Sequence, residues 1–167
     1  MKYYSIILSF IVLIFLPSQS LIAQTLKFNF GEPYQSVISE LKKDKSKRSK
    51  DGFPVEIDII ELEDRIIRIS NPWEKGWGAG KSVYEYHFSD NKLSKKVIIM
   101  SPGNANRMLA FWYKIMMKDL GEPNIIQADG KRIYCWNRPD NTKSCYYKAF
   151  SDWFQDECLF VVHEPIP

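Results

Sequence analysis

We expect the chain to be organised around the stretch Lys131–His163, KRIYCWNRPDNTKSCYYKAFSDWFQDECLFVVH. Its pattern predicts three short strands over Lys131–Asn137, Lys143–Phe150 and Glu157–His163, and each strand holds one of the chain's three cysteines. The sequence Pro-Asp-Asn at 139–141 favours a tight turn, because proline presets its backbone angle and Asp and Asn tolerate left-handed geometry. We therefore predict an antiparallel meander that anchors a small domain.

The cysteines indicate at least one disulfide. If the turn is centred on Asp140, Cys135 and Cys145 lie directly opposite each other. A disulfide can form there if the two residues are a non-hydrogen-bonded pair, where antiparallel strands come closest. Cys158 could instead face Cys145 across the next hairpin; otherwise it is a spare cysteine.

Metal binding and catalysis are not indicated. A zinc site needs four ligands, usually in close pairs, whereas the cysteines are widely spaced and His87 and His163 are isolated. His87 follows the alternation of its strand onto the face opposite the aromatic residues, which favours a surface or edge position. His163 beside Glu164 is an isolated candidate for a hydrolase. We expect no metal, no cofactor and no catalytic residue.

The N-terminus has the pattern of a secretory signal peptide. Lys2 supplies a positive charge, Ile6–Leu16 is an uncharged, largely apolar run, and Pro17 breaks it. The apolar run has roughly 11 residues, whereas a membrane span needs about 20. Small side chains favour cleavage after either Ser20 or Ala23. We expect residues 1–23 to be a signal peptide and the protein to be exported to the periplasm or the extracellular space; the alternative is an uncleaved anchor.

The remaining residues 24–167 are enough for one domain. The chain is 45% hydrophobic and 26% charged, which is ordinary for a folded domain. Removal of residues 1–23 takes away only Lys2, so the net charge of +3 becomes +2. Such a weak charge does not suggest nucleic acid as a partner. We expect no membrane span after removal of the signal peptide, and the pattern says nothing of the oligomeric state.

Ahead of the meander, the patterns predict two helices among further strands. Residues 24–30 suggest a short strand or an extended arm, and an apolar stripe after Pro33 suggests a helix. Two hairpins over Phe53–Ser70 and Val83–Met100 follow, and the second is expected to turn at Asp90-Asn91, which sets Phe88 beside Leu93 and Tyr84 beside Val97. A helix over Ala105–Leu120 comes next, with Phe111 on its apolar face, and a short strand is expected at Ile125-Ile126. We predict an α+β domain with an antiparallel sheet of about seven or eight strands and both helices on one face.

The loop Asn71–Lys81, NPWEKGWGAGK, is the best candidate for a binding site. Its two tryptophans, Trp73 and Trp77, sit among three glycines, and Lys81 closes the loop. Exposed tryptophans can stack on a sugar or pack into a partner protein. The alternative is that both tryptophans cap an open end of the core.

A basic segment at residues 42–50, between the first predicted helix and the first hairpin, is a second candidate contact region. It gathers six basic residues, which suits an acidic partner or phospholipid headgroups. The other interpretation is a solvated connecting loop over Asp44–Gly52, because acidic residues dilute the charge and no aromatic residue is interleaved.

Two short motifs resemble a known class of exported domains. Phe30-Gly31 precedes the first helix, and Leu120-Gly121-Glu122-Pro123 ends the second. Together they resemble the small helix-plus-sheet domains of the BamE and β-lactamase-inhibitor-protein type. The resemblance implies a protein-binding module of the bacterial envelope, and it assigns no binding residue.

Three functions are compatible with these patterns. The first is an exported, non-catalytic binding protein, of which an inhibitor or immunity protein is a special case, with Asn71–Lys81 as its contact loop. The second is an unrecognised extracytoplasmic hydrolase. The third is a structural component of the envelope.

Overall fold

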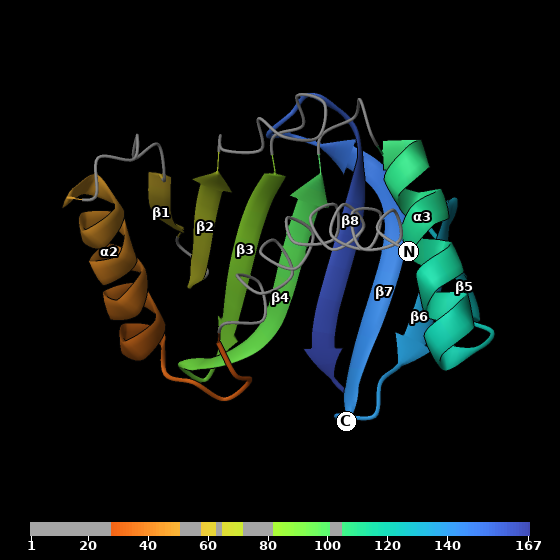
Figure 1. Ribbon diagram of the computed structural model, residues 1–167, viewed down its shortest axis with the longest axis horizontal. Coiled ribbons are helices and arrows are strands. Elements are labelled where there is room, and N and C mark those ends of the chain that lie inside the picture. Colours follow the sequence, from red (N-terminus) through yellow and green to blue (C-terminus); the bar gives the residue numbers. More distant parts are fainter. Residues whose placement is uncertain (1–27, 51–57, 63–64, 72–81, 101–104) are drawn as a thin grey trace, which may run out of the picture.

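The protein folds as one sheet with two helices (Figure 1) in a computed structural model that describes residues 28–50, 58–62, 65–71, 82–100 and 105–167. The predicted signal peptide, residues 1–23, lies outside the described residues. In chain order the elements are α2 (Tyr34–Lys50), β1 (Asp58–Leu62), β2 (Ile66–Asn71), β3 (Ser82–Ser89), β4 (Lys92–Met100), α3 (Ala105–Leu120), β5 (Asn124–Ala128), β6 (Lys131–Asn137), β7 (Thr142–Ser151) and β8 (Asp156–Pro165).

The eight described strands form one antiparallel sheet in the order β1-β2-β3-β4-β8-β7-β6-β5. Each half, β1 to β4 and β5 to β8, is a meander of neighbouring strands, and the pairing of β4 with β8 joins the two halves. Helix α3 carries the chain from the centre of the sheet to its far edge, where β5 begins. The predicted α+β class and strand number are confirmed.

Both helices pack on the same face of the sheet, as predicted. Strand β3 shows why, because its side chains point alternately to the two faces, and Tyr84 and Tyr86 both lie on the face that the helices cover. They belong to one buried core with Val37 and Ile38 of α2 and Met116 of α3. The opposite face carries a smaller buried cluster of Val83, Val97, Ile99 and Cys158.

Helix α2 begins as its sequence predicts and ends later. Gly31 has φ +88°, and Pro33 precedes the first helical residue, where a missing N–H costs little. The helix continues to Lys50, so the interpretation of the basic run as a connecting loop is wrong up to that residue. The reason is that Lys, Arg and Ser are compatible with a helix, and residues 34–50 contain no glycine or proline to end it.

Residues 28–30 form a bend that leads into a turn rather than the predicted strand or extended arm, and Phe28 is buried in the core on the helical face. The ammonium of Lys96 donates a hydrogen bond to the carbonyl of Phe28 and lies 4.5 Å from the centre of the Phe30 ring. Burial lowers the pKa of Lys96, and the acidic side chains of Glu32 and Asp140 partly oppose that shift. The rest of the predicted segment 24–30 lies outside the described residues.

The β3–β4 hairpin turns at Asp90-Asn91 as predicted, and both residues have positive φ angles, 49° and 64°. Phe88 pairs with Leu93, as the turn implies. The prediction that Tyr84 pairs with Val97 is wrong by one residue, because a bulge shifts the register and Tyr84 pairs with Ile98.

Helix α3 has the predicted bounds and ends at Gly121, whose φ is +80° and whose N–H bonds the carbonyl of Met117. Met116 is buried, and Trp112 packs against the core. Phe111 was expected on the same apolar face but is 48% exposed, because it lies at the margin of the stripe. No helix among the described residues is long and apolar enough to cross a membrane.

The C-terminal meander confirms the predicted disulfide. Cys135 pairs with Cys145 across β6 and β7, and their sulfurs are bonded at 2.10 Å. The alternative pairing does not occur, because Cys145 pairs with Val162 on β8 while Cys158 pairs with Ala149. Cys158 keeps a free thiol that is fully buried.

Candidate binding surface

Strand β5 is an open edge of the sheet. It lies last in the strand order, and no described strand pairs with its outer side. At the opposite edge, helix α2 lies beside β1 (Figure 1). There the side chains of Tyr34 and Lys42 both donate hydrogen bonds to Glu61 of β1.

The direction of each backbone N–H and C=O group on β5 follows from the spacing of the cysteine pair and the register of the strands. The Cα atoms of Cys135 and Cys145 are 4.1 Å apart, the short spacing of a non-hydrogen-bonded antiparallel pair. The N–H and C=O of Cys135 therefore point away from β7 and towards Asn124, its partner on β5. Because the direction alternates along a strand, Asn124, Ile126 and Ala128 bond to β6. Ile125 and Gln127 point their N–H and C=O groups outwards.

This outward pattern has a limit at each end. Pro123 precedes the strand and has no N–H to offer. Asp129 follows it with φ +51° and turns the chain into β6 together with Gly130. The open edge thus offers two donors and two acceptors, all of them on Ile125 and Gln127.

The side chains of β5 are uncharged and largely exposed. The strand reads NIIQA, and Ile125 and Ile126 are 41% and 40% exposed on opposite faces of the sheet. Ile125 pairs with Tyr134 on the helical face, and Ile126 pairs with Ile133 on the other. Natural sheets usually protect an edge with a charged residue, a proline or a bulge within the strand, and β5 carries none of these.

The support behind this edge is rigid. The disulfide links β6 to β7, and the indole N–H of Trp136 donates a 2.8 Å hydrogen bond to the carbonyl of Gly121, just before β5. The ring of Tyr113 on α3 packs edge-on against Tyr134 and Trp136 of β6. The backbone of β5 is therefore held in place before any partner arrives.

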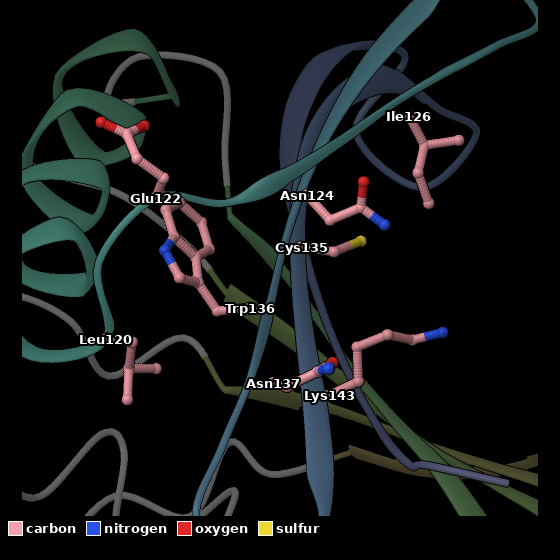
Figure 2. Close-up of a pocket in the computed structure, with 8 residues that line it drawn as sticks. All are labelled: Leu120, Glu122, Asn124, Ile126, Cys135, Trp136, Asn137 and Lys143. Atoms are coloured by element: carbon pink, nitrogen blue, oxygen red, sulfur yellow. The ribbon is translucent and has the colours of Figure 1, made fainter.

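A hollow of about 310 Å³ lies beside the edge (Figure 2). Its lining residues are Leu120, Glu122, Asn124, Ile126, Cys135, Trp136, Asn137 and Lys143. Figure 2 shows Glu122 and Trp136 on one side of the strands, and Ile126 and Lys143 on the other. Polar groups do not converge on one point, as they do in small-molecule sites. The hollow therefore belongs to the edge rather than to an enclosed ligand site.

The hydrolase candidate His163 is part of a buried pair. Its Nδ1 lies 2.8 Å from the hydroxyl oxygen of Ser144, and the two residues are 9% and 0% exposed. Burial, assisted by the charges of Arg138 and Lys96, lowers the pKa of His163 to about 4. An imidazole with that pKa is a weak base at neutral pH, and the pair lines neither the hollow beside β5 nor the hollow between Phe28 and α2.

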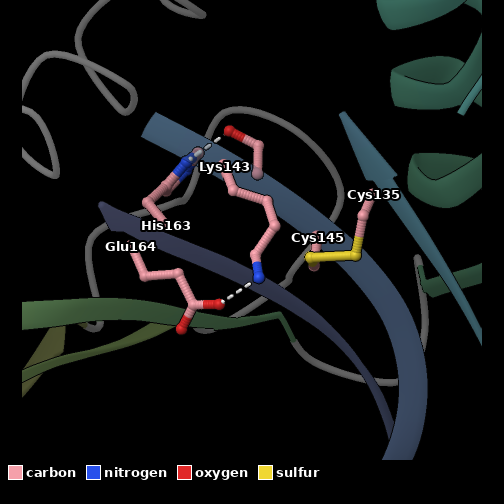
Figure 3. Close-up of a disulfide and its surroundings, with 6 residues drawn as sticks. Cys135, Lys143, Cys145, His163 and Glu164 are labelled. Carbon is pink, nitrogen blue, oxygen red and sulfur yellow. Dashed lines mark hydrogen bonds and ion pairs between the residues drawn. A yellow bond between two sulfur atoms is a disulfide. The ribbon is translucent and has the colours of Figure 1, made fainter. Parts of the chain in front are cut away.

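Glu164, the neighbour of His163, does not join it. Its carboxylate lies 2.8 Å from the ammonium of Lys143. Successive residues of a strand point to opposite faces, so this ion pair lies on the side of the sheet opposite His163 (Figure 3). The Ser144–His163 contact is thus a satisfied polar pair on the helical face of the sheet, without a third catalytic group from Glu164.

A second polar cluster occupies the face without helices. The guanidinium of Arg68 lies 2.6 Å from one carboxylate oxygen of Glu85, and His87 lies 2.9 Å from the other. Burial raises the pKa of Glu85, but the hydrogen bonds from His87 and Arg68 outweigh it, so the net shift is downwards. Trp153, on the β7–β8 turn, lies 5.5 Å from the guanidinium of Arg68. The charges in this cluster satisfy one another.

The residues predicted from sequence as a binding site cannot be placed. Trp73, Trp77 and Lys81 lie outside the described residues, between the end of β2 and the start of β3. His87, expected at the surface or an edge, is half-buried against Glu85. Sequence reasoning missed the β5 edge, although the uncharged run between Pro123 and the Asp129-Gly130 turn was a usable signal.

Within the part of the chain that the structure describes, no group of three His, Cys, Asp or Glu residues could hold a metal ion. Comparison with protein families, with curated proteins and with solved structures found no match to this chain. The resemblance to BamE-type domains therefore stays a prediction.

Proposed function

We propose that this protein is an exported, non-catalytic binding module that takes an extended segment of another protein along strand β5. The observation that carries the proposal is the open edge itself. Two residues, Ile125 and Gln127, direct four backbone groups outwards from a strand that has no charge and two exposed isoleucines.

Binding at such an edge works by strand addition. An incoming segment gains main-chain hydrogen bonds from Ile125 and Gln127, and these bonds do not depend on its sequence. Specificity then comes from its alternate side chains, which would lie beside Ile125 on one face and Ile126 on the other. A segment whose side chains are apolar and uncharged suits both positions.

Two observations support an extracytoplasmic setting. The N-terminal pattern of residues 1–23 is that of a signal peptide. The Cys135–Cys145 disulfide is the kind of cross-link that persists in oxidising compartments. The loop Asn71–Lys81 stays a second predicted contact site of the same module.

The test compares two substitutions at one position. Gln127→Pro removes an outward N–H without breaking a bond to β6, because proline is tolerated on the open side of an edge strand. Gln127→Ala keeps that N–H and serves as the matched control. Tagged wild type and both variants are incubated with an envelope extract, and bound proteins are identified by mass spectrometry.

We expect a partner that wild type and Gln127→Ala retain and Gln127→Pro loses. In the reconstituted complex, the amides of Ile125 and Gln127 should gain protection from hydrogen exchange. Equal recovery of the partner by all three proteins, or unchanged exchange at those two amides, would contradict binding at β5.

A further inference from the structure

We infer that a second copy of this chain is a partner for the edge, with the two β5 strands antiparallel about a twofold axis at Ile126. The inference rests on the proposed use of the edge as a binding surface and names one occupant for it. It follows from a symmetry in the backbone of β5 itself.

The outward groups of β5 are self-complementary about Ile126. When Ile126 lies opposite its own copy, Ile125 of each chain lies opposite Gln127 of the other. Both residues point outwards, so each such pair exchanges two hydrogen bonds, as in a regular antiparallel ladder. The N–H and C=O groups of Ile125 and Gln127 in each chain then all have a hydrogen-bond partner.

Neighbouring registers do not achieve this. If the axis passes through Ile125, the carbonyl of Gln127 meets Pro123, which has no N–H to donate. If the axis passes through Gln127, Ile125 meets Asp129, whose φ of +51° has already turned the chain. Pro123 and Asp129 both lie three positions from Ile126, so the strand ends symmetrically about the proposed axis.

The side chains are compatible with this register. Ile126 contacts its own copy on the face without helices, where non-hydrogen-bonded pairs bring side chains closest. On the helical face, Ile125 lies beside Gln127 of the other copy. The five-residue ladder contains no charged residue, so two identical strands meet without repulsion between like charges. These matches follow from the symmetry of two identical strands, and a different protein would not provide them automatically.

The contact is small. A stable protein interface buries about 1,200–2,000 Å² in total, and a five-residue strand pair offers less than that. We therefore expect a weak dimer whose population rises with protein concentration. This expectation separates it from an obligate dimer, in which the monomer does not persist.

The first measurement is sedimentation velocity of the mature chain from about 10 μM to about 1 mM, the range in which weak dimers of this kind dissociate. Wild type and Gln127→Ala should shift from monomer to dimer over this range, and Gln127→Pro should stay monomeric with an unchanged circular dichroism spectrum. A wild type that stays monomeric throughout, or a Gln127→Pro variant that still forms the dimer, would overturn the inference.

The second measurement fixes the register by oxidative cross-linking. Ile126→Cys should form a disulfide with its own copy, identified by mass spectrometry as a 126–126 linkage. Phe150→Cys, at a site 61% exposed and away from β5, is the control for random collision. Wild type is the control for Cys158, which is fully buried. Equal cross-linking at positions 126 and 150 would refute the register.

The two proposals fail separately. A monomeric wild type that retains a protein partner, lost in Gln127→Pro, would overturn self-pairing and support the binding function. A dimer that is lost in Gln127→Pro, with no other protein retained by wild type, would support self-pairing and overturn the binding of a different protein.

Discussion

The stability of the protein should fall steeply between pH 6.5 and pH 4 because of one buried histidine. Burial lowers the pKa of His163 from 6.5 to about 4. Between these values the unfolded chain binds a proton at this residue and the folded protein does not. Stability is therefore fully present above the unfolded pKa and is lost as the pH falls to the folded pKa. At about 1.4 kcal/mol for each unit, the loss is about 3 kcal/mol.

The assay is urea unfolding of wild type and His163→Asn at a series of pH values from 7.5 to 4. Asparagine offers Ser144 a side-chain oxygen as acceptor but does not titrate. Carboxylates such as Glu85 titrate in both proteins, so the difference between the two profiles reports His163. We expect the wild type to lose about 3 kcal/mol more than the variant across this range. Parallel profiles would refute the account of His163 as a buried neutral base.

Three further changes test the scaffold by urea unfolding. Replacement of Cys135 and Cys145 by alanine should cost about 2–3 kcal/mol, because the cross-link closes a short loop, and reductant should have no effect on this variant. Gly121→Ala should lower the free energy of unfolding by about 1 kcal/mol because of its φ of +80° alone, since an added Cβ meets nothing within 4 Å. An unchanged free energy of unfolding would contradict the left-handed backbone at Gly121. Leu159→Ala should cost about 2–5 kcal/mol, whereas exposed Phe150→Ala should stay within about 0.5 kcal/mol, and equal losses would contradict the assigned core.

Local features of the fold were predictable because they depend on neighbouring residues. The turn at Asp90-Asn91 needs residues that tolerate positive φ angles, and these two do. Helix α3 has an apolar stripe and a glycine at its end, so its bounds Ala105–Leu120 could be read from the pattern. Cys135 and Cys145 could be predicted to lie opposite each other because both are five residues from Asp140, the centre of the turn between their strands.

The remaining features depend on non-local packing or on a single extra residue. The bulge leaves Ser94 unpaired and shifts the register, and no alternation of polar and apolar residues marks it. Helix α2 continues to Lys50 because nothing in the basic run stops it, although charge alone suggests a loop. The exposure of Phe111 depends on how far α3 is rotated on the sheet.

The candidate site shows the same division. Sequence predicted a short strand at Ile125-Ile126, but it could not show that this strand lies at an edge. That position follows from the pairing of β4 with β8, two strands far apart in the chain, which joins the two meanders and leaves β5 outermost. The loop Asn71–Lys81, which sequence favoured, lies largely outside the described residues and stays a prediction.

Hydrogen exchange of individual backbone amides tests the open edge most directly. In dilute protein, the amides of Ile125 and Gln127 should exchange rapidly, while that of Ile126 is protected by its bond to β6. When the protein is concentrated or bound to a partner, Ile125 and Gln127 should become protected as well. Protection of these two amides in the dilute monomer, or their rapid exchange in every complex, would contradict the assignment of β5 as the binding edge.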